Sequence, residues 1–135
     1  MLLNATSRKG SDAVFWLAEP KKNHWSYTLL AGAHMQQQVD IDRDRWADLP
    51  EYQRGILRPR FFWDDGTGNS LFVTTGATAE DRAGGSSGFP EELRTRRFDA
   101  GAAGRFVAGT KLVSVRSSLM TQRHRHRFGP TLERD

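Results

Sequence analysis

Residues 54–80 have the sequence RGILRPRFFWDDGTGNSLFVTTGATAE, and the fold follows from this stretch. Asp, Gly and Asn gather at residues 64–69, and these residue types tolerate the positive φ angles of short hairpin turns. Before this cluster, the odd positions hold the apolar residues Leu57, Pro59, Phe61 and Trp63. Several even positions hold charged residues, namely Arg54, Arg58, Arg60 and Asp64. Residues 70–80 alternate in a similar way. A period of two predicts a β-hairpin with one apolar and one polar face.

The composition excludes several classes of site without choosing a function. The 135 residues suffice for one ordinary domain, and 20 Lys plus Arg against 16 acids give a net charge of +4 and a pI near 10.0. A basic balance permits binding to nucleic acid, anionic lipid or phosphate-rich sugars. The absence of cysteine excludes disulfides, thiolate catalysis and cysteine zinc sites. The first residues form no apolar run of signal-peptide length, and no stretch approaches the ~20 apolar residues of a spanning helix.

Alternation along the rest of the chain predicts about six strands. They are expected at residues 12–19, 24–37, 54–64, 70–80, 95–108 and 111–125. Residues 38–53 and 81–94 are expected to be long loops, the second because its Gly-Gly-Ser-Ser-Gly-Phe-Pro segment disfavours regular structure. The predicted fold is therefore all-β, an antiparallel up-and-down meander.

The predicted connections alternate in length, which would place the short turns at one rim of the sheet and the long loops at the other. Five aromatic residues are expected on the apolar face near the short-turn rim: Trp25, Tyr27, Phe61, Trp63 and Phe106. Strands of roughly ten residues, long loops at one rim and such an aromatic girdle are typical of outer-membrane barrels. A soluble antiparallel sandwich or lipocalin-like barrel also alternates. The polar face here, however, carries Arg, Gly, Ser and Thr in place of the Lys and Glu of a soluble sheet surface.

Five segments resemble the barrel region of TonB-dependent outer-membrane receptors. They are residues 56–66 (ILRPRFFWDDG), 70–82 (SLFVTTGATAEDR), 95–101 (TRRFDAG), 114–120 (SVRSSLM) and 123–129 (RHRHRFG). The resemblance covers the chain from about Ser11 onward. These segments are strand sequences and contain no catalytic motif.

The resemblance implies a large transmembrane barrel, usually of about 22 strands, that holds a plug domain. Such receptors import a scarce solute such as a siderophore, cobalamin or a sugar. The implied partners are outer-membrane lipid and lipopolysaccharide, the remaining barrel and plug, the TonB complex and the small-molecule solute, with no nucleic acid. Residues 1–135 contain no plug domain, and about six strands cannot close such a barrel. We therefore expect an incomplete segment of a large transmembrane β-barrel, located in the outer membrane and not functional alone.

Residues 40–51, DIDRDRWADLPE, have the ligand spacing of a calcium loop. The predicted ligands are the carboxylates of Asp40, Asp42, Asp44, Asp48 and Glu51 and the backbone carbonyl of Trp46. Calcium is the only cofactor that the sequence suggests. Arg45 stands where such loops need glycine, and Arg43 and Arg45 could supply the positive charge in place of a metal. An ordinary solvated acidic loop therefore remains an open alternative.

Arginines recur on the predicted polar face, where they would line a watery lumen. These lumen-facing residues are Arg58, Arg60, Arg97, Arg105 and Arg116, with Asp64, Glu80 and Asp99 as expected ion-pair partners. The run RHRHR at 123–127 would place three arginines on one face and two histidines on the other. It could bind zinc or phosphates, or be a solvated strand end. No spacing brings Ser, His and Asp together and no nucleotide loop is present, so no catalytic residue is assigned and an enzyme is not expected.

Two hypotheses remain, and they differ in where the large apolar side chains point. A receptor barrel segment would expose them on one face of the sheet. A soluble antiparallel β-domain, acting as a binding module for nucleic acid or an anionic glycan, would bury them in one dry core.

Overall fold

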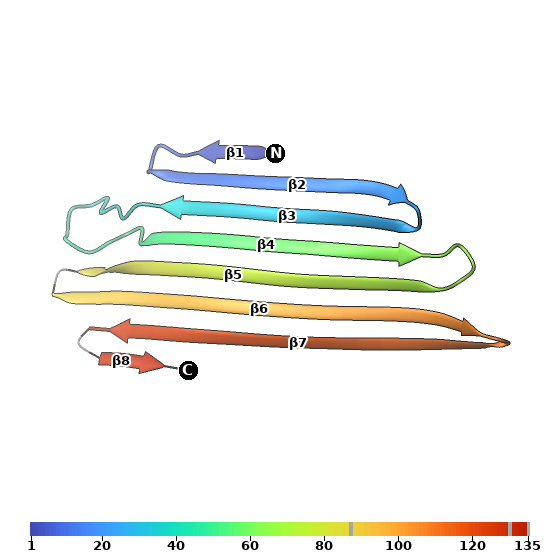
Figure 1. Ribbon diagram of the computed structural model, residues 1–135. Coiled ribbons are helices and arrows are strands. Elements are labelled where there is room, and N and C mark those ends of the chain that lie inside the picture. Colours follow the sequence, from blue (N-terminus) through green and yellow to red (C-terminus); the bar gives the residue numbers. More distant parts are fainter. Residues whose placement is uncertain (87, 130, 135) are drawn as a thin grey trace.

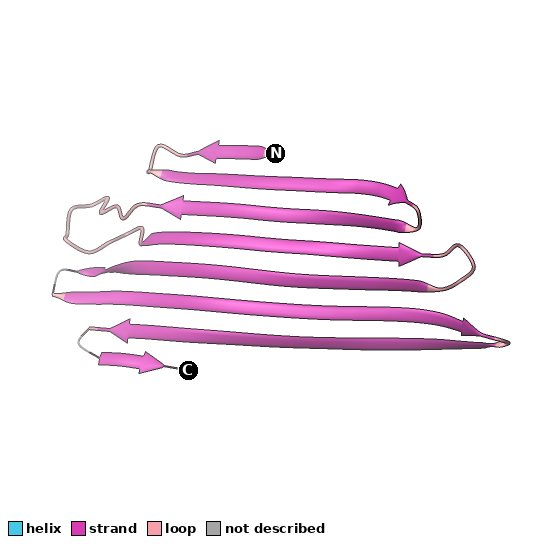
Figure 2. Ribbon diagram, viewed as in Figure 1, coloured by secondary structure: helices cyan, strands magenta, loops and turns pink. Residues whose placement is uncertain are grey.

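Eight strands follow one another in a single open sheet in the computed structural model, which describes residues 1–86, 88–129 and 131–134 (Figures 1 and 2). The strands are β1 (Leu2–Ala5), β2 (Gly10–Lys22), β3 (Trp25–Gln36), β4 (Glu51–Asp64), β5 (Ser70–Ser86), β6 (Phe89–Ala108), β7 (Lys111–Phe128) and β8 (Thr131–Arg134). Each strand pairs antiparallel with the next along the chain. The predicted all-β antiparallel meander is confirmed.

The six long strands, β2 to β7, correspond to the six predicted strands, and two short strands, β1 and β8, extend the sheet at its edges. The short connections form as their residue types predict. Asn23 and His24 both have positive φ, as a two-residue hairpin turn requires. Gly66 and Gly68 have positive φ between β4 and β5, and Gly109 does between β6 and β7. We call the rim formed by these three connections the turn rim and the opposite rim the loop rim (Figure 1).

The prediction of a long loop at residues 81–94 is wrong. Strand β5 continues to Ser86 and β6 begins at Phe89, and the two strands pair without interruption from Ser70↔Arg105 to Ser86↔Phe89. Charged side chains hold this extension together, because Asp81 lies opposite Arg94, forms an ion pair with it and accepts a hydrogen bond from Arg96. The glycines do mark a turn, but a tight one. The loop between β3 and β4 is long as predicted, although it ends at Pro50 because β4 begins at Glu51.

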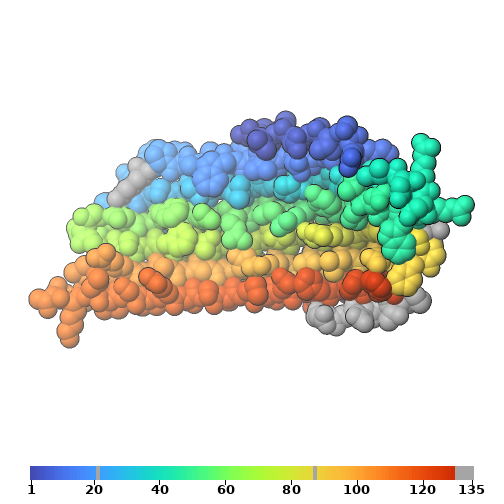
Figure 3. Space-filling view, turned by 180° about the vertical axis from the view of Figure 1, so that it is seen from behind, coloured from blue at the N-terminus to red at the C-terminus, as the bar shows by residue number. Residues whose placement is uncertain are grey.

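The sheet has one layer and no hydrophobic core among the described residues. Figure 3 shows neighbouring strands as parallel rows of side chains with nothing packed over them. Large apolar side chains remain exposed on a sheet with no second layer, for example Trp25 at 54%, Leu57 at 49% and Leu119 at 59%. The strand register fixes which side chains share each exposed face.

The strand register sorts the side chains into an apolar face and a polar face. On the apolar face, Leu17 lies opposite Leu29, Ala31 opposite Leu57, and Ala100 opposite Leu119. The polar face holds the alternate positions, where Arg60 lies opposite Thr28 on one side and Thr74 on the other. The cross-strand pairing extends this division from β2 to β7. Between β3 and β7 no register shift exchanges the two faces.

Candidate functional site

The five predicted girdle aromatics lie on the apolar face near the turn rim. Trp25 pairs with Trp63, with ring centroids 6.4 Å apart, and Tyr27 pairs with Phe61 at 6.5 Å. Phe106 belongs to the same face and lies opposite Val113. Its ring covers the space that a side chain at Gly104 would fill, so the glycine admits the close approach of the ring.

Between the two rims, small and aliphatic residues cover the apolar face. The central positions of the strands are Leu29, Ala31 and Ala33 on β3, Leu57 on β4, Val73 and Ala77 on β5, and Ala100 and Ala102 on β6. We call this surface the apolar band, and the five aromatics border it at the turn rim. Exposure of this apolar surface to water is unfavourable. Burying it would stabilise the protein by about 25 cal/mol for each Å² removed from water.

All five predicted lumen arginines lie on the polar face, but only two of them have ion-pair partners among the described side chains. Arg58 and Arg97 share Asp99, at 3.3 and 3.5 Å between nitrogen and oxygen. Gly76 makes room for this triad, since a Cβ there would lie 2.8 Å from the Asp99 carboxylate and 2.9 Å from Nη2 of Arg58. Arg60, Arg105 and Arg116 have no carboxylate partner in the described part of the chain.

A second triad on the polar face is centred on Glu80, an expected ion-pair partner, and includes Arg82, which was not expected on this face. Glu80 forms ion pairs with Nε of Arg82 at 2.7 Å and with Nε of Arg54 at 3.5 Å. Arg82 also lies over the ring of Tyr52, 5.9 Å from its centroid. Arg82 was placed in a predicted loop, which hid its position on a strand. The alternation that continues from Thr78 through Glu80 to Arg82 was the available signal.

Two histidines of the polar face, His34 and His124, lie within hydrogen-bonding distance of neighbours in the sheet. Nδ1 of His34 lies 2.9 Å from Oδ1 of Asp12, and the hydroxyl of Thr95 lies 3.0 Å from Nδ1 of His124. Strand β7 places His124 and His126 on this face and the three arginines of 123–127 on the other, as predicted. No group of three metal-ligating side chains includes either histidine in the described ranges.

The acidic loop between β3 and β4 brings three of the predicted calcium ligands together. Carboxylate oxygens of Asp40, Asp42 and Asp48 lie within 4.8 Å of one another, while Asp44 and Glu51 stay outside this group. Backbone amides already occupy these oxygens. Asp40 accepts from the N–H groups of Arg43 and Arg45 at 2.6 and 3.0 Å, and Asp48 accepts from that of Ile41 at 2.6 Å.

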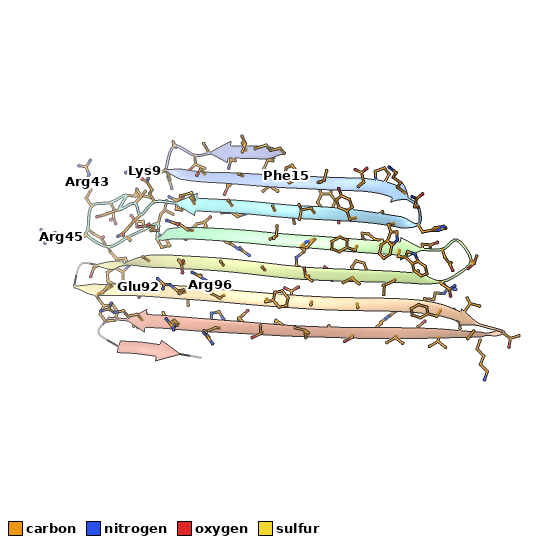
Figure 4. All side chains as sticks on the ribbon, viewed as in Figure 1. Lys9, Phe15, Arg43, Arg45, Glu92 and Arg96 are labelled. Atoms are coloured by element: carbon orange, nitrogen blue, oxygen red, sulfur yellow. The ribbon has the colours of Figure 1, made fainter. Side chains whose placement is uncertain are left out.

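Both arginines of this loop have positive φ, 65° for Arg43 and 74° for Arg45. Arg45 thus adopts the backbone conformation for which calcium loops use glycine. Both side chains extend away from the loop into solvent (Figure 4). The three carboxylates remain a candidate for calcium, and the calcium hypothesis stays a prediction.

The described residues contain no helix that is long and apolar enough to cross a membrane. No family model, curated protein or solved structure matches this chain. Its chemistry must therefore be inferred from its own two faces. One face offers an uncovered apolar band with an aromatic border, and the other offers arginine-carboxylate triads that suit contact with water or with a charged solute.

Proposed function

We propose that this chain is part of an outer-membrane TonB-dependent receptor that takes up a scarce solute such as a siderophore, cobalamin or a sugar. The observation that carries the proposal is the apolar band, which covers one face of β3 to β6 while the described residues bury no hydrophobic side chain. A soluble binding module needs such residues in a core. A barrel wall needs them on its outer surface, in contact with lipid.

The distribution of residue types on each face supports a membrane wall. The five aromatics border the apolar band at the turn rim, where aromatic rings suit the boundary between hydrocarbon and headgroups. The opposite face carries Arg58, Arg97 and Asp99 in an ion-paired triad, which suits a wet lumen. Membrane barrels show the same alternation along each strand, with apolar residues toward lipid and polar residues toward the watery interior.

The unpaired edges support a larger barrel. β8 pairs only with Arg125–Phe128 of β7, so the outer edge of β7 from Lys111 to His124 has no partner strand in the described sheet. At the other side, β1 pairs with Ser11–Val14 of β2 and leaves Phe15–Lys22 open. Lipid does not tolerate unpaired backbone groups, each of which costs several kcal/mol there. Further strands of a receptor would cover both edges.

Single-tryptophan variants test which face meets lipid. Trp25 and Trp16 are 54% and 52% exposed but lie on opposite faces of the sheet. In a chain refolded into phosphatidylcholine vesicles, we expect brominated acyl chains to quench Trp25 and to leave Trp16 largely unquenched. The matched control carries Trp16 as its only tryptophan. Equal quenching of both, or a soluble monomer in water with a buried Trp25, would contradict the membrane assignment.

The receptor assignment needs a separate test, because a lipid-facing wall is shared by many barrels. The coding sequence on either side of this chain should continue in frame into a plug domain and further alternating strands. If the flanking sequence encodes neither, the assignment to a TonB-dependent receptor is overturned, while the proposal that the apolar band faces lipid is unaffected.

A further inference from the structure

Four arginines form a block on the apolar face at the loop rim. Arg94 lies directly opposite Arg125, and Arg96 lies directly opposite Arg123. Residues at i and i+2 of a strand are about 7 Å apart and cross-strand partners about 5 Å apart, so the block is a small rectangle of four guanidinium side chains. Figure 4 shows Arg96 on β6 at this end of the sheet. Like charges directly opposite one another destabilise a sheet unless an anion compensates them.

The carboxylates nearby compensate only one side of the block. Asp81 lies on the β5 side, where its Oδ1 forms an ion pair with Nε of Arg94 at 3.0 Å and its Oδ2 accepts a hydrogen bond from Nη2 of Arg96 at 2.8 Å. Arg127, the next arginine along β7, has Glu92 at 3.9 Å. Arg123 and Arg125 have no carboxylate within ion-pair distance among the side chains that the structure describes. The surplus positive charge therefore lies along β7.

The block directly continues the apolar band. Phe98 and Ala100 are the next two positions of β6 on the same face, and Leu119 lies opposite Ala100. A groove beside the block is lined by Glu51, Gln53, Asp81, Arg94, Arg125 and Arg127. A ligand that covers both surfaces needs an anionic group at one end and a long apolar part at the other.

We propose that the block formed by Arg94, Arg96, Arg123 and Arg125 binds the phosphate groups of an anionic lipid whose acyl chains lie on the apolar band. The proposal rests on the proposed function, because it requires the apolar band to face lipid. Arginine suits this role because its planar guanidinium donates two parallel hydrogen bonds to one phosphate. Arg123 and Arg125 lie two positions apart on the same face of β7, about 7 Å, and the ion pairs with Asp81 hold Arg94 and Arg96 beside them.

The experiment uses the full chain in neutral detergent micelles, with diphosphorylated lipid A as the probe and native mass spectrometry to count bound lipid. The test variant carries Arg123→Gln and Arg125→Gln. The matched control carries Arg60→Gln and Arg116→Gln, which removes the same charge from the opposite face. We expect the test variant to bind the probe roughly tenfold more weakly or worse, since it loses charge-assisted hydrogen bonds, and the control to bind as the parent does.

Other outcomes separate the possible failures. Equal binding by the test variant and the parent overturns the proposal, as does equal weakening in the test and control variants. Inorganic pyrophosphate that binds as tightly as the lipid also overturns it, since the site would then recognise free phosphate. Far-UV circular dichroism confirms that both variants keep their strands. Bromolipid quenching of Trp25, measured separately in vesicles with Trp25 as the only tryptophan, shows whether the proposed function itself has failed.

Discussion

At Gly85 the backbone has a φ of +82°, and a Cβ built there would overlap the carbonyl oxygen of Phe89. Glycine is therefore required at this position for two reasons: the positive φ angle and the close approach of the opposite strand. We predict that Gly85→Ala lowers the free energy of unfolding by about 1–3 kcal/mol, measured by urea unfolding in detergent. Gly55→Ala is the control, because nothing lies within 4 Å of its Cβ position. Similar effects from the two substitutions would contradict the tight β5–β6 connection.

The Asp65 carboxylate organises the turn between β4 and β5. The hydroxyl of Thr67 and the side-chain amide of Asn69 donate to it, together with the N–H groups of both residues, and these bonds hold the pKa of Asp65 well below its usual range. A lowered folded-state pKa means that the stabilisation is complete above the unfolded pKa of about 3.9 and is lost as the pH falls toward the folded value.

We therefore predict that Asp65→Ala destabilises the chain at pH 7 and that the difference from the parent shrinks at about pH 3. Urea unfolding at the two pH values measures it. A difference that stays constant, or grows in acid, would show that the carboxylate does not act through these hydrogen bonds.

Along one strand, the two faces of the sheet predict opposite tolerance to charge. Ala100 and Ala103 both belong to β6, but Ala100 lies opposite Leu119 on the apolar face and Ala103 opposite Phe72 on the polar face. In lipid vesicles, we predict that Ala100→Arg lowers the free energy of unfolding by about 2–4 kcal/mol and that Ala103→Arg lowers it much less. The reason is that only the arginine at position 100 would contact hydrocarbon. Unfolding in vesicles compares them, and a costlier Ala103→Arg would reverse our assignment of the faces.

The loop between β3 and β4 provides a test of the calcium hypothesis. Trp46 lies within the loop and is 47% exposed, so its fluorescence in a variant without the other tryptophans reports on loop structure. If the loop binds calcium, we predict that millimolar calcium changes the emission and that Asp40→Asn abolishes the change. Asp44→Asn should matter less, since Asp44 lies outside the group of three carboxylates. An emission that calcium leaves unchanged would favour an ordinary solvated acidic loop.

The sequence predicted strands wherever alternation was regular and failed where glycine and charge coincided. The pattern from Leu57 to Val73 predicted the central hairpin and its two faces, because a period of two leaves one arrangement of polar and apolar side chains. Residues 81–94 were mistaken for a loop because glycines outweighed alternation that was carried by charged residues. The block at Arg94 and Arg125 was equally hidden, since the opposition of two arginines depends on cross-strand register.

At the scale of the whole molecule, the open edges should decide how the isolated chain behaves. The chain has no cysteine, so a single introduced cysteine gives an unambiguous cross-link. Leu119 lies on β7, whose outer edge has no partner from Lys111 to His124 in the described sheet, while Leu57 lies on β4 between two paired strands. We predict that in lipid a short bismaleimide joins copies through Leu119→Cys and not through Leu57→Cys. Without neighbouring barrel strands, copies can satisfy their backbone groups only by pairing edge to edge. A monomer that keeps its strands in lipid without such pairing would show that the backbone groups at the edges find other partners. The sheet would then not need further barrel strands, which would contradict the proposed larger barrel.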